Sequence, residues 1–258
     1  MLNRGAQART ATPFDPPARR RRLRTIGVVA ATLALAALPA AAQVGHPPAN
    51  SPYRDIRKGH SFTPVYGQFG GDGGSLGIGP HDGPAYGFRY DIRNGSTLQF
   101  GFAFSYAELQ RLIVNPFVEL ANRVSGPVDQ TVGLAEINLQ FNLTGTKTWH
   151  RLAPFLGAGI GLTFPNTTPG DSSGYDFGHK IYLVPSAGVR LFVTDRLFLR
   201  GEVRSVFWKL KYPNSFTLEP RLEPGTPDHP NAVIINGDLS EWDASTWLLA
   251  GLGFSFAF

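Results

Sequence analysis

The sequence predicts an all-β protein, an eight-stranded antiparallel transmembrane up-and-down β-barrel, on three observations. Apolar residues alternate with small or polar residues along eight segments, the connections between these segments are alternately short and long, and the apolar faces are nearly free of charge. Alternation at every second residue places side chains on opposite faces of a strand. A bulky apolar face opposite a small, polar face is typical of a barrel that meets lipid outside.

The C-terminal segment, residues 245–258, shows the alternation most clearly. One face carries Leu248, Ala250, Leu252, Phe254, Phe256 and Phe258, and the other is mostly small. Seven similar segments precede it, at 62–71, 84–92, 97–106, 133–143, 152–164, 180–194 and 197–209. Most of them have at least the roughly 9–11 residues that a tilted strand needs to cross a bilayer.

The connections alternate in length. Short turns are expected at Asn94-Gly95, 144–147 and 194–196, and long loops at 71–83, 107–130, 165–179 and 212–244. Short turns on one side and long loops on the other are typical of outer-membrane barrels, and an even strand number places both termini on the short-turn side. Within the second long loop, residues 107–124 have a helix-like apolar spacing broken by Pro116. We expect this segment first to pack as core onto the barrel rim, and a short surface helix or a binding lip for an apolar ligand are the alternatives.

The net charge of +5 is concentrated at the N-terminus. Residues 1–42 hold seven of the 24 basic residues and one of the 19 acidic residues, so the remainder is close to neutral and no nucleic-acid partner is expected. The apolar run 26–38 and the small residues Ala40 and Ala42 follow the basic stretch, which is the order of a signal peptide cleaved after Ala42. The alternative, a membrane anchor, would need about 20 apolar residues.

These features divide the chain into a signal peptide at 1–42, a periplasmic N-terminal segment at 43–61 and a barrel at 62–258. The chain contains no cysteine, which excludes disulfides and cysteine-ligated metals. Four tryptophans and several tyrosines near strand ends predict aromatic girdles at the two membrane interfaces. These residues are Trp149, Trp208, Trp242, Trp247, Tyr106, Tyr182 and Tyr212.

Six charged residues fall on the inward faces of the predicted strands. They are Arg89, Glu136, Arg190, Arg200, Glu202 and Arg204. Eight strands enclose an interior that side chains can just fill, and buried charges need partners. We therefore expect these residues to pair and plug the interior. The alternative is a solute path in which the excess arginine favours anions.

No catalytic residue, cofactor or metal is expected, and the protein is predicted not to be an enzyme. His179 lies near Asp171, Ser172 and Asp176, but the spacing matches no hydrolase motif and predicts a solvated loop histidine. The glycine-rich stretch 70–74 lacks the strand-to-helix context of a phosphate loop.

The chain resembles the small eight-stranded outer-membrane barrels, the OmpA-like, OmpX-like and OmpW-like proteins, over 62–258. Its most specific match is the terminal strand, in which Leu252, Phe254, Phe256 and Phe258 fit the signal read by the barrel-assembly machinery. The resemblance implies a Gram-negative outer membrane, with membrane lipids, lipopolysaccharide and the assembly machinery as partners. We also expect a monomer.

A structural or surface-interaction role in the cell envelope is the function expected first. A narrow, porin-like channel for small or apolar solutes, as in the OmpW-like group, is the alternative. A lipid-modifying enzyme of the outer membrane is the third and weakest expectation, because fold alone does not specify activity.

Overall fold

The computed structural model of the protein describes residues 51–94, 97–235 and 237–257. The predicted signal peptide, with Ala40 and Ala42, and the terminal Phe258 lie outside these residues. Among the described residues, no helix combines the length and the apolarity needed to cross a membrane. Two 3-10 helices occur, at Leu120–Asn122 and Asn214–Thr217.

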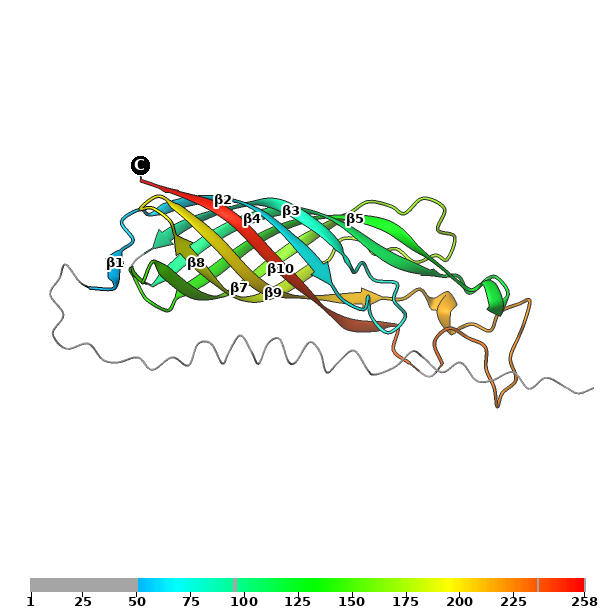
Figure 1. Cartoon of the computed structure of the whole chain (residues 1–258). Coiled ribbons are helices and arrows are strands. Elements are labelled where there is room, and N and C mark those ends of the chain that lie inside the picture. The colour runs from blue at the N-terminus through cyan, green and yellow to red at the C-terminus, as the bar shows by residue number, and fades with distance from the viewer. Residues whose placement is uncertain (1–50, 95–96, 236, 258) are drawn as a thin grey trace, which may run out of the picture. The chain divides into compact units, whose positions relative to one another are not determined.

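Eight long strands form a closed antiparallel ring, and the predicted fold class is confirmed (Figure 1). The strands are β2 (His60–Gly70), β3 (Gly83–Asn94), β4 (Leu98–Val114), β5 (Val124–Asn142), β7 (Leu152–Pro165), β8 (Ile181–Phe192), β9 (Leu197–Lys211) and β10 (Ser240–Phe256). Each strand pairs with its neighbour in sequence, and β10 pairs with β2 to close the ring. Two three-residue strands that the sequence did not predict, β1 (Tyr53–Asp55) and β6 (Lys147–Trp149), pair with each other.

The seam between the first and last barrel strands runs from the Thr246–Gly70 pair to the Phe256–His60 pair. The pairing is interrupted between Val65 and Phe62, where Pro64 lies. Proline has no backbone N–H to donate, so this short gap in the seam follows from the sequence.

The prediction of a long loop at 107–130 is wrong, as is that of a surface helix over 107–124, whereas core packing of this segment is observed for Leu109 and Val114. β4 continues to Val114 and β5 begins at Val124, so most of this region is a paired hairpin with its turn at 115–123. Leu109, Val132 and Leu134 point inward, whereas Glu108 and Gln110 point outward. That pattern is the reverse of the one used to recognise the membrane strands.

The two ends of the barrel differ, as expected from the connection lengths (Figure 1). At the turn end, β3 is joined to β4 and β8 to β9 by short connections, whereas the connection at 143–151 contains β6 and has nine residues. β1 and the end of β10 also lie at this end. At the opposite, loop end the connections are 71–82, 115–123, 166–180 and 212–239, and all but the nine-residue turn 115–123 are longer than any at the turn end.

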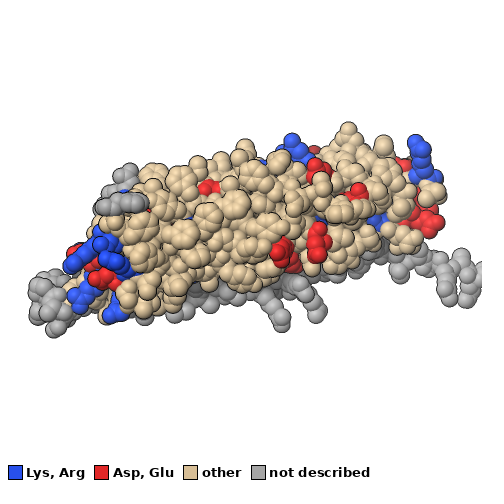
Figure 2. Space-filling model, turned by 90° about the horizontal axis from the view of Figure 1, so that it is seen from above, with Lys and Arg blue, Asp and Glu red and all other residues tan. Residues whose placement is uncertain are grey.

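The outer surface of the barrel carries a wide apolar belt. Figure 2 shows charged side chains gathered mainly toward the two ends, with few in the band between them. Exposed belt residues include Phe62, Phe88, Phe100, Phe102, Phe104, Ile137, Leu139, Leu156, Ile160, Leu183, Leu199, Leu248, Leu252 and Phe254. Exposed apolar surface of this extent is unusual for a soluble monomer and marks a face that contacts other apolar matter.

Candidate functional site

The chemistry of the barrel interior changes along the strands. On β9 the inward side chains, from the turn end to the loop end, are Phe198, Arg200, Glu202, Arg204, Val206, Trp208 and Leu210. The outward residues of the same strand change from Leu199 and Val203 to Lys209 and Lys211. The turn-end part is therefore polar inside and apolar outside, and the loop-end part is apolar inside and polar outside.

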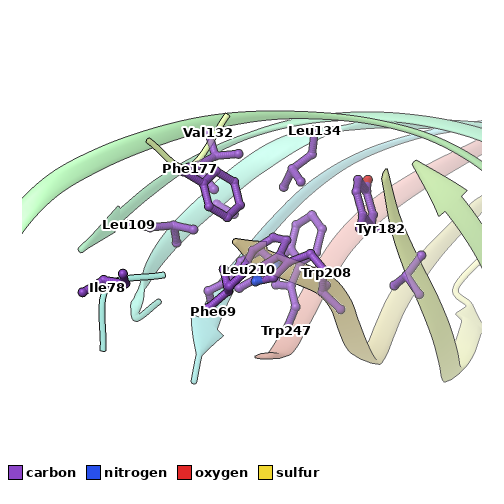
Figure 3. Close-up of a cluster of buried hydrophobic side chains, with 14 of the residues drawn as sticks. Phe69, Ile78, Leu109, Val132, Leu134, Phe177, Tyr182, Trp208, Leu210 and Trp247 are labelled. Carbon is purple, nitrogen blue, oxygen red and sulfur yellow. The ribbon is translucent and has the colours of Figure 1, made fainter. Parts of the chain in front are cut away.

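The loop-end part has a hydrophobic core of its own, which we call the loop-end core (Figure 3). Its strand residues include Phe69, Leu109, Val132, Leu134, Tyr182, Val184, Val206, Trp208, Leu210 and Trp247. Three long loops add Ile78, Tyr175, Phe177 and Phe216. The ring of Trp247 stacks on that of Phe69 at 4.8 Å between centroids, and Phe177 contacts Trp208 edge-on at 5.3 Å.

The loop-end core corrects part of the predicted aromatic girdle. Trp208 and Trp247 are 0% and 1% exposed and lie inside the barrel, as does Tyr182. Tyr212 is also buried in the loop-end core. Trp242, at 62% exposed, and Trp149 are on the surface. The interior is therefore not uniformly small and polar.

Next to the loop-end core, toward the turn end, all six predicted interior charges are buried, together with Asp91. We call these seven residues the charge layer. Arg204 pairs with Glu136 across the lumen and lies 3.6 Å from Glu202. Arg200 Nη2 lies 2.8 Å from Glu202 Oε2, and Arg89 Nε lies 2.7 Å from Asp91 Oδ1. Ion pairs thus connect strands β3, β5 and β9.

Amides and aromatic rings complete the surroundings of the charge layer. Arg200 Nη2 donates to Gln140 Oε1 at 2.9 Å, and Asn138 contacts both Arg89 and Glu136. The guanidinium of Arg200 lies 4.3 Å from the ring centroid of Phe155. That of Arg204 lies 4.8 Å from Trp247, which joins the charge layer to the loop-end core. Cations over aromatic faces are attracted by the ring quadrupole.

A small apolar group, the turn-end cluster, lies at the other end of the lumen. It consists of Ile56, Ala153, Phe192 and Phe198. Ile56 comes from the chain preceding β2, where its backbone N–H donates to Thr146 O at 2.8 Å. Arg93 donates to the carbonyl oxygens of Ile56 and Lys58. The segment 43–61, which the sequence predicts as a periplasmic N-terminal segment, therefore contributes the Ile56 side chain to the interior of the barrel.

A second buried ion pair, Arg111–Asp171, anchors loop 166–180 to the β4–β5 hairpin. Arg111 Nε also donates to Gln130 Oε1 at 3.2 Å, and its guanidinium lies 5.3 Å from the Tyr175 ring. Burial alone would raise the pKa of the Asp171 carboxyl, but hydrogen bonds from Ser173 and Arg111 outweigh it and lower that pKa. Sequence reasoning missed this pair because Arg111 was assigned to a loop; extending the β4 alternation would have placed it inward.

The glycine-rich loop after β2 docks on β10 across the seam. Gly74 N–H donates to Asp243 Oδ1 at 3.2 Å, and Ser75 N–H donates to Glu241 Oε1 at 2.6 Å. Gly73 and Gly74 have φ of +67° and +80°, a region that favours glycine. Burial raises the pKa of Asp243, although Trp208 Nε1 and the Gly74 N–H donate to it. The glycines thus allow a close contact between this loop and β10.

The residues weighed as catalytic do not assemble into a dyad. His179 Nδ1 contacts the carbonyl oxygen of Thr163 at 2.9 Å, and its ring lies against Phe164. Asp171 is engaged by Arg111 instead. Within 51–94, 97–235 and 237–257, no group of three or more His, Asp or Glu side chains is arranged to hold a metal ion.

The chain was compared with family models, curated proteins and solved structures. No family model matches the sequence, and no curated protein matches it. The chain is similar to small outer-membrane β-barrel proteins of known structure.

OprG from Pseudomonas aeruginosa is 10% identical, with 81% of this chain and 100% of that chain covered and a TM-score of 0.49. Neisserial surface protein A is 15% identical, with coverage of 80% and 98% and a TM-score of 0.45. The N-terminal barrel domain of Pseudomonas aeruginosa OprF is 12% identical, with coverage of 77% and 98% and a TM-score of 0.42. The fold of this chain is established by its own closed strand pairing.

Proposed function

We propose that this protein is a monomeric, non-enzymatic β-barrel of the Gram-negative outer membrane, with a closed interior and a structural or surface-interaction role. The observation that carries the proposal is the exchange of inside and outside chemistry along the strands. An apolar belt around an ion-paired lumen suits a bilayer, and a polar exterior around an apolar core suits water. One set of continuous strands contains both.

A closed interior is supported by three successive levels of packing. The loop-end core, the charge layer and the turn-end cluster follow one another along the lumen. Eight strands leave space that side chains of this size fill. No observation favours the narrow-channel alternative, since the loop-end half of the lumen is occupied by Trp208, Trp247 and Phe69.

The expected partners follow from the outer surface. The apolar belt would contact membrane lipids and, in the outer leaflet, lipopolysaccharide. The turn end would face the periplasm, so that both termini lie there and the terminal strand with Leu252, Phe254, Phe256 and Phe258 is available to the assembly machinery. The loop end, with the hairpin turn 115–123 and loop 212–239, would be the surface-interaction face.

A charge placed in the belt tests whether that face meets lipid. Phe102→Arg is expected to destabilise the barrel in phospholipid vesicles by about 2–4 kcal/mol, the cost of arginine near the bilayer midplane. Gln110→Arg is the matched control, because Gln110 points outward from the same strand beyond the belt. Urea titration, with folded protein scored by its different gel mobility before and after boiling, gives the measurement. Equal stability of the two variants, or unchanged mobility of the boiled wild type, would contradict a membrane barrel.

The closed interior predicts an absence of conductance. Purified protein in planar lipid bilayers is expected to give no stable single-channel steps, whereas a porin added to the same bilayers provides the positive control. Reproducible steps from the wild type would refute the closed interior without affecting the barrel fold or its membrane location.

A further inference from the structure

Positive charge exceeds negative charge at the turn end of the lumen. Among the described residues, Arg93 and Arg190 form no ion pair with a carboxylate. Both lie on the inward faces of their strands, β3 and β8. Asp91 acts electrostatically on Arg190, but it is already engaged by Arg89 at 2.7 Å and by Arg200 at 3.7 Å.

Arg190 is the member of the charge layer that lies against the turn-end cluster, and it is 2% exposed. Its Nη2 donates to Asn142 Oδ1 at 2.6 Å, and its guanidinium lies 5.9 and 5.8 Å from the ring centroids of Phe192 and Phe198. These contacts supply no negative ion. Arg89, Arg93 and Arg200 all repel it.

Several donors at this level have no acceptor. Arg190 Nε, Asn142 Nδ2 and Arg93 Nε are buried and without a hydrogen-bond partner among the described residues. Leaving buried donors unpaired costs free energy, and burying an uncompensated charge costs more. Arginine does not escape this cost by losing its proton. A water molecule satisfies a donor but leaves the charge uncompensated.

We propose that the turn-end level of the lumen binds a small monovalent inorganic anion, such as chloride, at the unpartnered N–H groups of Arg190 Nε and Asn142 Nδ2. The positive potential and the unpaired N–H groups select an anion. The enclosing Ile56, Phe192 and Phe198 side chains limit its size. The inference depends on the lumen alone, and it holds whether the protein serves as a structural barrel or in another role.

Thermal unfolding of the full-length protein in detergent micelles tests the site. Sodium gluconate is replaced by sodium chloride at constant ionic strength, which keeps screening unchanged while the small anion varies. A ligand that binds only the folded state raises its stability with concentration, so the midpoint is expected to rise with chloride. Each tenfold increase above the dissociation constant is expected to raise the folding equilibrium constant about tenfold.

Arg190→Gln is expected to abolish the chloride dependence. Arg196→Gln, in an exposed turn at the same end, is the matched control and is expected to retain it. Since Arg190→Gln can also weaken folding, crystals of the wild type grown in bromide give a second readout, an anomalous peak beside Arg190 Nε. A wild-type midpoint that does not respond to chloride, a dependence that survives Arg190→Gln, or bromide crystals without that peak would overturn the proposal.

Discussion

Trp208→Ala is expected to destabilise the folded protein by about 3–5 kcal/mol, the range for removing a large aromatic side chain from a packed core. Trp208 is fully buried in the loop-end core, contacts Phe177 and Phe69, and donates its indole N–H to Asp243 at 2.9 Å. Alanine leaves a cavity and removes one hydrogen bond to a buried carboxylate, which adds to the cost.

Trp242→Ala provides the matched control for this substitution. The residue lies on the neighbouring strand β10, opposite Lys209 of β9, and is 62% exposed. Its loss is expected to change the free energy of unfolding by less than about 0.5 kcal/mol, as for most surface substitutions. Urea-induced unfolding followed by tryptophan fluorescence and circular dichroism gives both values. Similar costs for the two variants would mean that the loop-end core is not packed as described.

Glu136→Gln is expected to cost about 3–5 kcal/mol, because breaking a buried pair leaves an uncompensated charge on Arg204. Arg204 is buried and its other acidic neighbour, Glu202, is held by Arg200. Glu136 also accepts from Tyr182 and Asn138, so its carboxylate connects three groups. Unfolding in urea at neutral pH gives the measurement.

A charge-balanced double variant separates the ion pair from mere packing. Glu136→Gln with Arg204→Met removes both charges and is expected to recover most of the stability lost in the single variant. Glu119→Gln, at an exposed position of the hairpin turn, controls for loss of an acidic residue and is expected to have little effect. A double variant as unstable as Glu136→Gln would show that the unpaired charge on Arg204 does not cause the loss of stability in the single variant.

The membrane-spanning part of the fold is readable from the sequence because one rule, apolar outside and polar or small inside, holds along every strand there. The rule fails at the loop end, where water replaces lipid and the two faces exchange chemistry. From Ala107 to Gln110 the alternation continues but the apolar residues change face, and from Arg111 to Val114 it is lost, so the region appeared to be a loop or helix. Trp208 and Trp247 share a face with Arg204 and Gly251, so their parity was compatible with the inward positions observed, but the girdle prediction placed them at the membrane interfaces instead.

The inward position of the six charged residues could be read from parity, but their partners could not. Arg204 and Glu136 lie 68 residues apart on strands that are not neighbours, and their contact depends on the register and stagger of the whole ring. The contribution of Ile56 to the turn end could not be predicted either. The strands β1 and β6, which pair beside it, have three residues each, and so short a sequence shows almost no alternation of apolar and polar residues.

The β4–β5 hairpin holds its turn well beyond the apolar belt. From Tyr106 to Val114 the strand continues for eight residues past the belt, about 26 Å along its axis at the usual rise per residue. Because the loop-end core and the Arg111–Asp171 pair hold this extension, the turn 115–123 is carried on a stiff support instead of a flexible tether. A partner docking there pays little conformational entropy to order the surface that it contacts.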